Sequence, residues 1–134
     1  MDIPVAGGDG WDSAKLPEIA GKDALNGTFF CNLYSPNDTS DLNKNFVAEY
    51  KNLYKSEPDV FAALSHDATM AIVKAIEDAK SADPAQIAVA MAKIKDLQGV
   101  TGATTFDDKH NPIKSAVIIE HVDGKQTFKT KINP

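Results

Sequence analysis

The stretch SAVIIEHVDGKQTFKTKI, residues 115–132, carries the strongest indication of fold in the chain. Two runs of β-branched and apolar residues flank the pair Asp123-Gly124. The second run, KQTFKTKI, alternates polar and apolar residues, as a strand with one buried face does. Asp-Gly readily adopts the positive φ angles of a two-residue hairpin turn. The stretch therefore predicts an antiparallel hairpin.

Three helices are predicted before this hairpin. Apolar residues recur every three to four positions over residues 42–54, which indicates an amphipathic helix. Asp59 follows a proline and can cap a long helix over residues 60–79. The residues of that helix are mostly small and apolar, which predicts burial on most of its sides. In SADPAQ, residues 81–86, an aspartate cap precedes a proline at the first position of a third helix.

Further strands are predicted over residues 3–6, 27–34 and 102–107. A short helix capped by Asp12 or Ser13 separates the first two of them. The resulting order is β-α-β-α-α-α-β-β-β. Strands followed by crossover helices favour an α/β fold with α-β-α layers, a mostly parallel sheet, and the antiparallel hairpin at its C-terminal end.

The composition limits the classes of function. The chain has 134 residues, of which 43% are apolar, enough for one core and about one domain. A net charge of −5 and the absence of arginine argue against nucleic-acid binding. The single cysteine, Cys31, excludes an internal disulfide, and its strand-like surroundings predict a buried, inert thiol.

The sequence contains no long apolar segment and no visible signal peptide. No run approaches the roughly 18 apolar residues that a transmembrane helix needs. The first residues show no basic region followed by an apolar core. We therefore expect either a cytoplasmic protein or a piece of a protein whose leader is not on this chain.

The loop GGDG, residues 7–10, has three possible interpretations: a phosphate loop, a plain turn, or the mouth of a ligand cleft. It does not fit the dinucleotide pattern G-x-G-x-x-G, because Ser13 stands where the third glycine is needed. Asp9 would also repel a phosphate. At the end of a strand, however, its carboxylate suits a cation such as an ammonium group, and Trp11 could form a wall beside it.

The sequence contains few patterns that are typical of catalytic or metal-binding sites. No two histidines have the i,i+4 spacing of a helical metal site; the three are His66, His110 and His121. There is no serine elbow of the G-x-S-x-G type, and Cys31 has no evident base partner. We therefore expect no enzyme activity, metal or cofactor. Phe61, at the start of the long predicted helix, is either a core residue or the wall of an apolar pocket.

Three stretches together resemble a known family. They are PVAGGDGWDS (4–13), FAALSHDA (61–68) and GVTGATTFDDKHNPIKSAVII (99–119), of which the last is the most specific. In this order they are similar to the carboxy-terminal part of the solute-binding proteins of branched-chain amino acid ABC transporters. The resemblance implies a type I periplasmic-binding-protein fold: two α/β lobes, joined by three crossing segments, that close on an amino acid by a hinge motion.

The resemblance also implies a division of the chain between the lobes. Residues 1–33 would belong to the second lobe, residues 34–115 to the first lobe, and residues 116–134 to the second lobe again. The chain would hold two of the three hinge crossings. Because family members are considerably longer, we expect a truncated gene product or an expressed fragment that lacks the amino-terminal section and leader.

By resemblance, four residues are assigned to the ligand site. Asp9 matches the acidic residue that grips the ligand's α-ammonium group, although the family often has glutamate there. Gly10 lets the backbone approach the ligand. Phe61 matches an aromatic residue that lines the side-chain pocket, and Trp11 would lie at the rim.

The partners implied are a small amino acid and the ABC permease, and the implied location is periplasmic or extracellular, either lipid-anchored or soluble. An alternative is a stand-alone amino-acid sensing or interaction domain with the same fold. A homodimer formed by exchange of elements is also expected, because faces that normally meet the missing section would be exposed.

Overall fold

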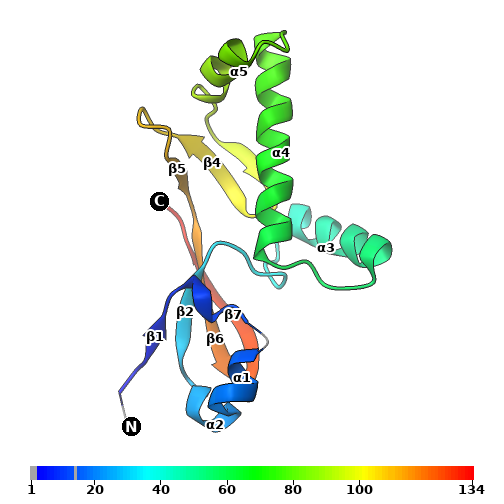
Figure 1. Ribbon diagram of the computed structural model, residues 1–134. Coiled ribbons are helices and arrows are strands. Elements are labelled where there is room, and N and C mark those ends of the chain that lie inside the picture. Colours follow the sequence, from blue (N-terminus) through cyan, green and yellow to red (C-terminus); the bar gives the residue numbers. More distant parts are fainter. Residues whose placement is uncertain (1–2, 14) are drawn as a thin grey trace.

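The computed structural model describes residues 3–13 and 15–134, which form a mixed α/β fold with two parts (Figure 1). The sheet part contains β1 (Ala6–Gly7), a 3-10 helix (Asp9–Trp11), α1 (Lys15–Ala20), α2 (Lys22–Leu25), β2 (Phe29–Asn32), β6 (Ala116–Val122) and β7 (Lys125–Ile132). The helical part contains α3 (Asp41–Tyr54), α4 (Val60–Ala79), α5 (Pro84–Met91), β3 (Leu97–Gly99), β4 (Gly102–Phe106) and β5 (Pro112–Lys114). The α/β class is thus confirmed.

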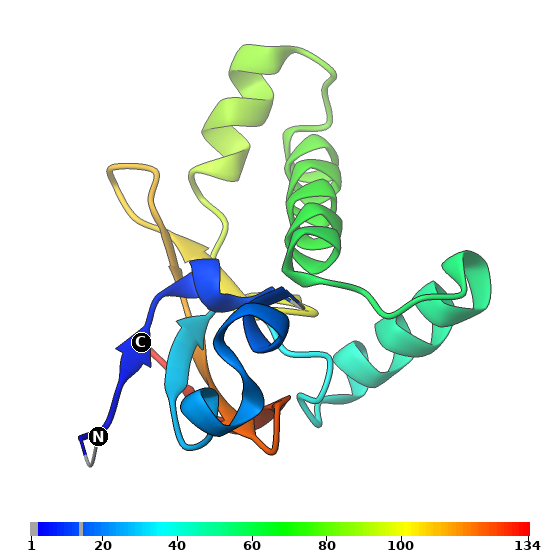
Figure 2. The ribbon, with the colours of Figure 1, turned by 60° about the horizontal axis from the view of Figure 1, so that its bottom comes forward.

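The strands form two sheets, with the orders β1-β2-β6-β7 and β3-β4-β5. Only β1 and β2 pair in parallel among the described strands, and the other neighbours are antiparallel. The prediction of a mostly parallel sheet was therefore wrong. The helices α3, α4 and α5 lead into a separate sheet, away from the four-stranded one, so they are not crossover connections within it (Figures 1 and 2).

The C-terminal hairpin is confirmed. Val122 pairs with Lys125 across the turn. Both turn residues have positive φ, 50° at Asp123 and 78° at Gly124, as the sequence pair requires.

The helices α4 and α5 begin directly after their predicted caps, and α3 begins one residue before its predicted range, after a serine cap. Ser40 accepts the amide of Asn43 at 3.4 Å, and Asp59 accepts the amide of Ala62 at 2.8 Å. Asp83 accepts an amide at 3.0 Å and is followed by the proline that opens α5. The short strands β3 and β5 were not predicted, because three residues are too few to show a period.

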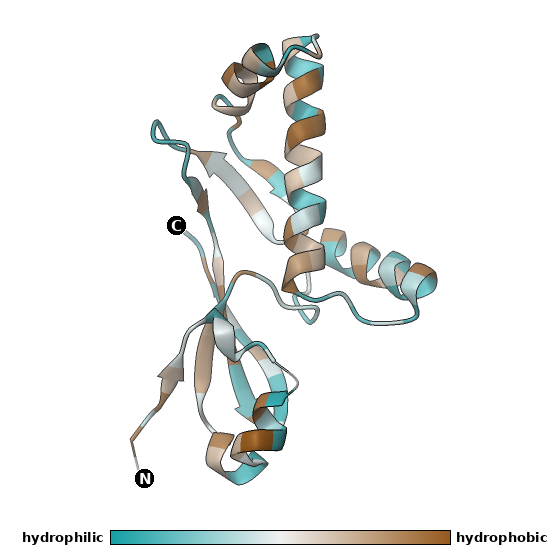
Figure 3. Cartoon of the chain, in the orientation of Figure 1, coloured by the Kyte–Doolittle hydropathy of each residue, from teal (hydrophilic) through white to brown (hydrophobic). Residues whose placement is uncertain are grey.

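The helix α4 is less buried than its composition predicted. Its buried residues are small: Ala63, Ala71 and Ala75. Larger apolar side chains on it are 39–47% exposed: Met70, Ile72, Val73 and Ile76. Figure 3 shows that hydrophobic and hydrophilic positions both occur along this helix. The prediction was wrong because α5 and β3 pack against one side of α4 and leave another side open.

None of the described helices is both long enough and apolar enough to cross a membrane.

The four-stranded sheet has its own core, formed by Phe30, Val117 and Ile119. Successive strand residues point to opposite faces, so the burial of Phe30 and Asn32 turns Cys31 outward. Cys31 is exposed, and the prediction of a buried thiol was wrong.

His121 is a fully buried side chain of this core, with 0% exposure. The Thr28 hydroxyl donates to the Leu25 carbonyl at 2.7 Å, and its oxygen lies 3.1 Å from Nδ1 of His121. Since that hydroxyl proton is already used, Nδ1 carries the ring proton and Nε2 does not. Nε2 has no hydrogen-bond partner among the described residues. Burial lowers the pKa of His121.

This lowered pKa predicts a loss of stability in acid. The unfolded chain binds a proton at its histidine near pH 6.5, whereas the folded chain resists protonation of Nε2. The free energy of unfolding should therefore be steady above about pH 6.5 and fall as the pH drops below it. Denaturant titrations at several pH values measure this. His121→Phe should flatten the dependence, and His110→Gln, at an exposed site, should keep it. Equal pH dependence in both variants would contradict the assignment.

Candidate functional site

A cleft with a volume of about 790 Å³ lies between the sheet part and the helical part. Its lining comes from four segments, within residues 12–17, 32–37, 57–61 and 119–126. The volume falls within the range of about 300–1,000 Å³ that small-molecule sites occupy. Below, this cavity is called the cleft.

The two parts are joined at two crossings of the chain and by an ion pair. Leu33 leaves β2 toward the helical part, and the single residue Ser115 joins β5 to β6. An ion pair links β7 to the loop before α3, with Lys131 Nζ 3.0 Å from Asp38 Oδ2. Burial is the largest single effect on the pKa of Asp38, and it raises that pKa. The hydrogen bonds from Ser40 and Lys131, together with the charge of Lys131, outweigh burial, so the pKa is lowered overall.

On the sheet side, the cleft contains a carboxylate held in place by a buried amide. Asn32, only 3% exposed, donates from Nδ2 to Asp12 Oδ2 at 2.8 Å. The amide of Leu33 donates to Asn32 Oδ1 at 2.8 Å, which fixes the orientation of the Asn32 side chain. Asp12 therefore projects into the cleft from a defined position.

On the helical side, Phe61 lines the cleft in the first turn of α4 and is 75% exposed. The preceding residue, Val60, packs instead against the core cluster of Tyr34, Ala63 and Val100. Phe61 is thus not a core residue in this structure. An exposed aromatic ring in a cavity can contact an apolar ligand.

Tyr34 is a cleft residue that sequence analysis did not single out. It is 3% exposed, and its hydroxyl has no hydrogen-bond partner among the residues that the structure describes. Burial, followed by the charges of Glu57 and Asp38, raises its pKa, so the phenol stays protonated at neutral pH. Nothing local in the sequence separates Tyr34 from an ordinary strand-end aromatic.

Asp9 and Gly10 lie together in the 3-10 helix that follows β1, and both are exposed. Neither belongs to the lining of the cleft. A Cβ at Gly10 would have no neighbour within 4 Å, so the backbone there is open to approach. Asp9 and Gly10 therefore lie next to each other, but they are not in the cleft that Phe61 lines.

Trp11 occupies a third environment. It packs against the core of the four-stranded sheet, and its ring covers the backbone of Gly7, where a Cβ would collide with it. Trp11 is not part of the cleft lining. Its contacts hold the 3-10 helix onto the sheet.

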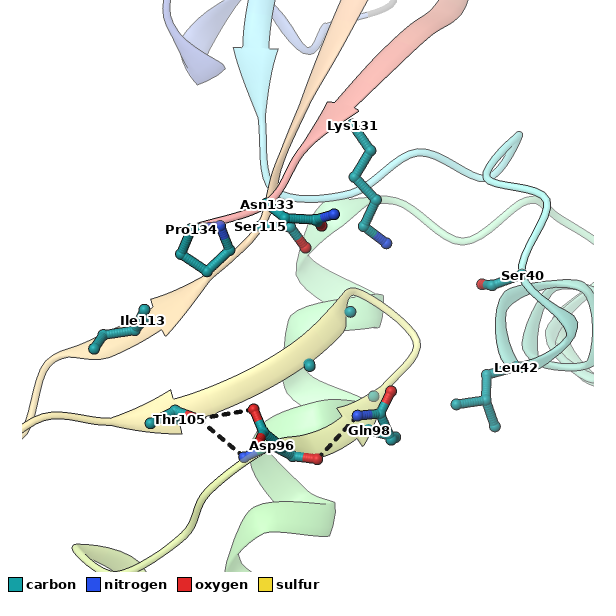
Figure 4. Close-up of a pocket in the computed structure, with 13 residues that line it drawn as sticks. Ser40, Leu42, Asp96, Gln98, Thr105, Ile113, Ser115, Lys131, Asn133 and Pro134 are labelled. Carbon is teal, nitrogen blue, oxygen red and sulfur yellow. Dashed lines mark hydrogen bonds between the residues drawn. The ribbon is translucent and has the colours of Figure 1, made fainter.

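A second cavity, of about 590 Å³, lies beside β3, β4 and β5 (Figure 4). Several of its polar groups bond to one another. The backbone amide of Asp96 donates to Thr105 Oγ1 at 2.9 Å, and Gln98 donates to the Asp96 carbonyl at 3.0 Å. Lys131 is engaged with Asp38. Because these groups are already satisfied, the second cavity is a weaker candidate than the cleft.

Comparisons with known proteins place this arrangement in a family. A leucine-binding protein, LivK, from Thermotoga maritima MSB8 is 36% identical, with a TM-score of 0.86; the match covers 100% of this chain and 38% of that one. The branched-chain amino acid transporter substrate-binding protein LivJ from Streptococcus pneumoniae, in complex with isoleucine, is 30% identical, with a TM-score of 0.83 and coverage of 99% and 38%.

A more distant structure shares the fold alone. The solute-binding protein of an ABC transporter from R. palustris, in complex with benzoate, is 24% identical, with a TM-score of 0.76 and coverage of 98% and 36%. The chain thus spans about 38% of the length of the first two relatives. A family model described as periplasmic binding protein matches residues 2–126. The chain therefore belongs to the periplasmic binding protein family.

Proposed function

We propose that this chain forms part of the ligand site of an extracytoplasmic solute-binding protein, which delivers branched-chain or other small amino acids to an ABC permease. The observation that supports this most is the exposed ring of Phe61 in a cleft between two parts of the fold. The relatives at 36% and 30% identity are a leucine-binding protein and a protein in complex with isoleucine. Such proteins bind and release their ligands without chemical change, and a periplasmic or extracellular location follows from the same likeness.

In this proposal Phe61 contacts the apolar side chain of the ligand, while Asp9 accepts hydrogen bonds from its ammonium group as the lobes close. Gly10 leaves the backbone accessible, and Trp11 supports the loop at the rim. An ammonium–carboxylate hydrogen bond contributes about 1.5–3 kcal/mol, whereas micromolar affinity needs about 8 kcal/mol. Apolar contact, a site for the α-carboxylate and closure must supply the remainder.

Closure would be a hinge motion between two lobes. Residues 1–33 and 116–134 would form one lobe, to which the sheet part belongs, and residues 34–115 would belong to the other. The single residue Ser115 joins β5 to β6, and Leu33 alone lies between β2 and Tyr34, which is buried in the core of the helical part; this suits a hinge in which few residues change their backbone angles. The Lys131–Asp38 ion pair lies across the same junction.

A titration with L-leucine tests the proposal. Because the chain spans only 38% of its relatives' length, we expect weak binding, with a dissociation constant in the millimolar range or above. Two-dimensional ¹⁵N NMR detects such binding and maps it. Shifts should gather at residues 57–61 and at the loop containing Asp9. Tight binding in calorimetry would contradict the expectation of weak affinity, and a complete lack of shifts would contradict the proposed function.

Replacing Phe61 by alanine should weaken leucine binding by about tenfold, because the apolar contact of one large side chain is lost. Stability should change little, since the ring is 75% exposed. The measurement is the initial slope of the leucine titration. Leu53→Ala is the matched control, at a residue 71% exposed on α3 and outside the cleft lining. Equal initial slopes for the two variants would show that Phe61 does not contact leucine.

A further inference from the structure

Asp12 was expected at most to cap a helix, yet its side chain lies in the cleft. It follows the 3-10 helix, and its amide donates to the Asp9 carbonyl at 2.9 Å. That bond fixes the backbone at Asp12. Its carboxylate is held separately, by Asn32 at 2.8 Å.

The partner of this carboxylate is neutral. Asn32 is buried, and its oxygen already accepts the amide of Leu33, so its nitrogen must face Asp12. The amide orients the carboxylate without neutralising its charge. No other hydrogen bond to the Asp12 side chain is found within residues 3–13 and 15–134. One carboxylate oxygen therefore stays available to a donor that enters the cleft.

The other charged groups of the cleft are used differently. Glu57 forms an ion pair with Lys51 at 2.6 Å, and Asp59 caps α4. Lys125 also lines the cleft, but no ion pair joins it to Asp12. Of these three acids, Glu57 is paired with a cation, Asp59 binds the backbone of its own helix, and Asp12 is held by a neutral side-chain amide.

A second polar group beside the cleft lacks a partner among the described residues. The hydroxyl of Tyr34 is buried and has no hydrogen-bond partner among the described residues, although Tyr34 belongs to the cleft lining. A buried, unpaired hydroxyl is costly and calls for an explanation, such as a partner outside the chain described.

We propose that Asp12, positioned by Asn32, accepts a hydrogen bond from the ammonium group of the ligand in the cleft. This rests on the proposed function and adds an acceptor to it. An ammonium group has three protons, so Asp12 and Asp9 can both bind it. Asp12 lines the cleft, whereas Asp9 lies outside its lining, three residues earlier in the same loop.

The test uses the side-chain amide of Asn32 as a reporter in ¹⁵N NMR. Three probes are titrated into the full chain: L-leucine, 3-methylbutylamine, which keeps the ammonium group, and 4-methylpentanoate, which keeps the carboxylate. Leucine and the amine should shift the Asn32 side-chain signals, and 4-methylpentanoate should not. Asp12→Asn should weaken leucine binding by at least about tenfold, since a charge-assisted bond is lost. Asp108→Asn, at an exposed turn, is the matched control.

The outcomes separate this inference from the proposed function. If leucine shifts residues 57–61 but leaves the Asn32 signals unchanged, Asp12 is not an acceptor, while the proposed function stands. An unchanged affinity in Asp12→Asn, folded as judged by its spectrum, overturns the inference in the same way. If 4-methylpentanoate alone shifts Asn32, the cleft holds the carboxylate end at this point, and the inference also fails. If leucine shifts nothing, both fail.

Discussion

Asp67→Ala is expected to lower the free energy of unfolding by about 3–5 kcal/mol, the largest effect among the substitutions considered. One Asp67 oxygen accepts the amide of Val100 at 2.8 Å, and the other accepts the amide and hydroxyl of Thr101, at 2.8 and 2.5 Å. The Asp67 side chain is 11% exposed. Alanine would leave these donors without their acceptor, in a place that water reaches poorly.

The same carboxylate joins α4 to the turn between β3 and β4. A Cβ at Gly99 would lie 2.5 Å from Asp67 Cγ, so the strand approaches the helix as closely as glycine permits. Lys114 Nζ lies 2.5 Å from the Thr101 hydroxyl oxygen and donates to it. Burial lowers the pKa of Lys114, the charge of Asp67 opposes that shift, and Lys131 adds to it. Removing Asp67 would therefore also take away the charge that favours protonated Lys114.

Thermal unfolding measures this effect, with an expected fall in Tm on the order of 10 °C for a chain of this size. Asp78→Ala is the matched control on the same helix. Asp78 pairs with Lys74 at a surface where both side chains are 46% exposed, and such pairs contribute about 0–1 kcal/mol. If the two variants lost equal stability, Asp67 would not be an important link between α4 and the turn between β3 and β4.

Asn43→Ala is expected to cost about 2–3 kcal/mol. Asn43 is 0% exposed, and its Nδ2 donates to the carbonyls of Ser35, Pro36 and Asp38 at 3.2, 3.2 and 2.9 Å. These carbonyls belong to the segment that leads from β2 into α3. Alanine would remove this donor from the partly buried carbonyls of Pro36 and Asp38, and it would leave the buried Ser35 carbonyl with the amide of Asp38.

Denaturant unfolding measures the loss, and hydrogen exchange should show faster opening of residues 35–40. Asn43→Asp should be worse than alanine at neutral pH, because a carboxylate would face three carbonyl oxygens. Asn52→Ala, at an exposed position of the same helix, is the control and should change little. Equal hydrogen exchange in Asn43→Ala and the control would contradict a role for Asn43 in holding this segment.

The sequence determined the elements whose causes are local. The aspartates at positions 59 and 83 cap their helices through bonds to amides three residues ahead, and Asp123-Gly124 turns the hairpin through its own backbone angles. Such interactions span a few residues, so the pattern contains the whole cause. The quoted motifs also indicated the family, which the match over residues 2–126 confirms.

Only the tertiary structure decided what depends on distant partners. Cys31 is exposed because the opposite face of β2 carries the buried Phe30, which packs beside Val117 and Ile119 of β6. The direction of the strands depends on where α3 to α5 lead the chain. The candidate site shows the same limit: Phe61 and Asp9 were named from motifs, but Asp12 enters the cleft through an amide twenty residues away in sequence. Such contacts join residues far apart in the sequence, so forming them requires closing long loops, which costs conformational entropy. Whether they form depends on the whole fold, and a short stretch of sequence does not contain that information.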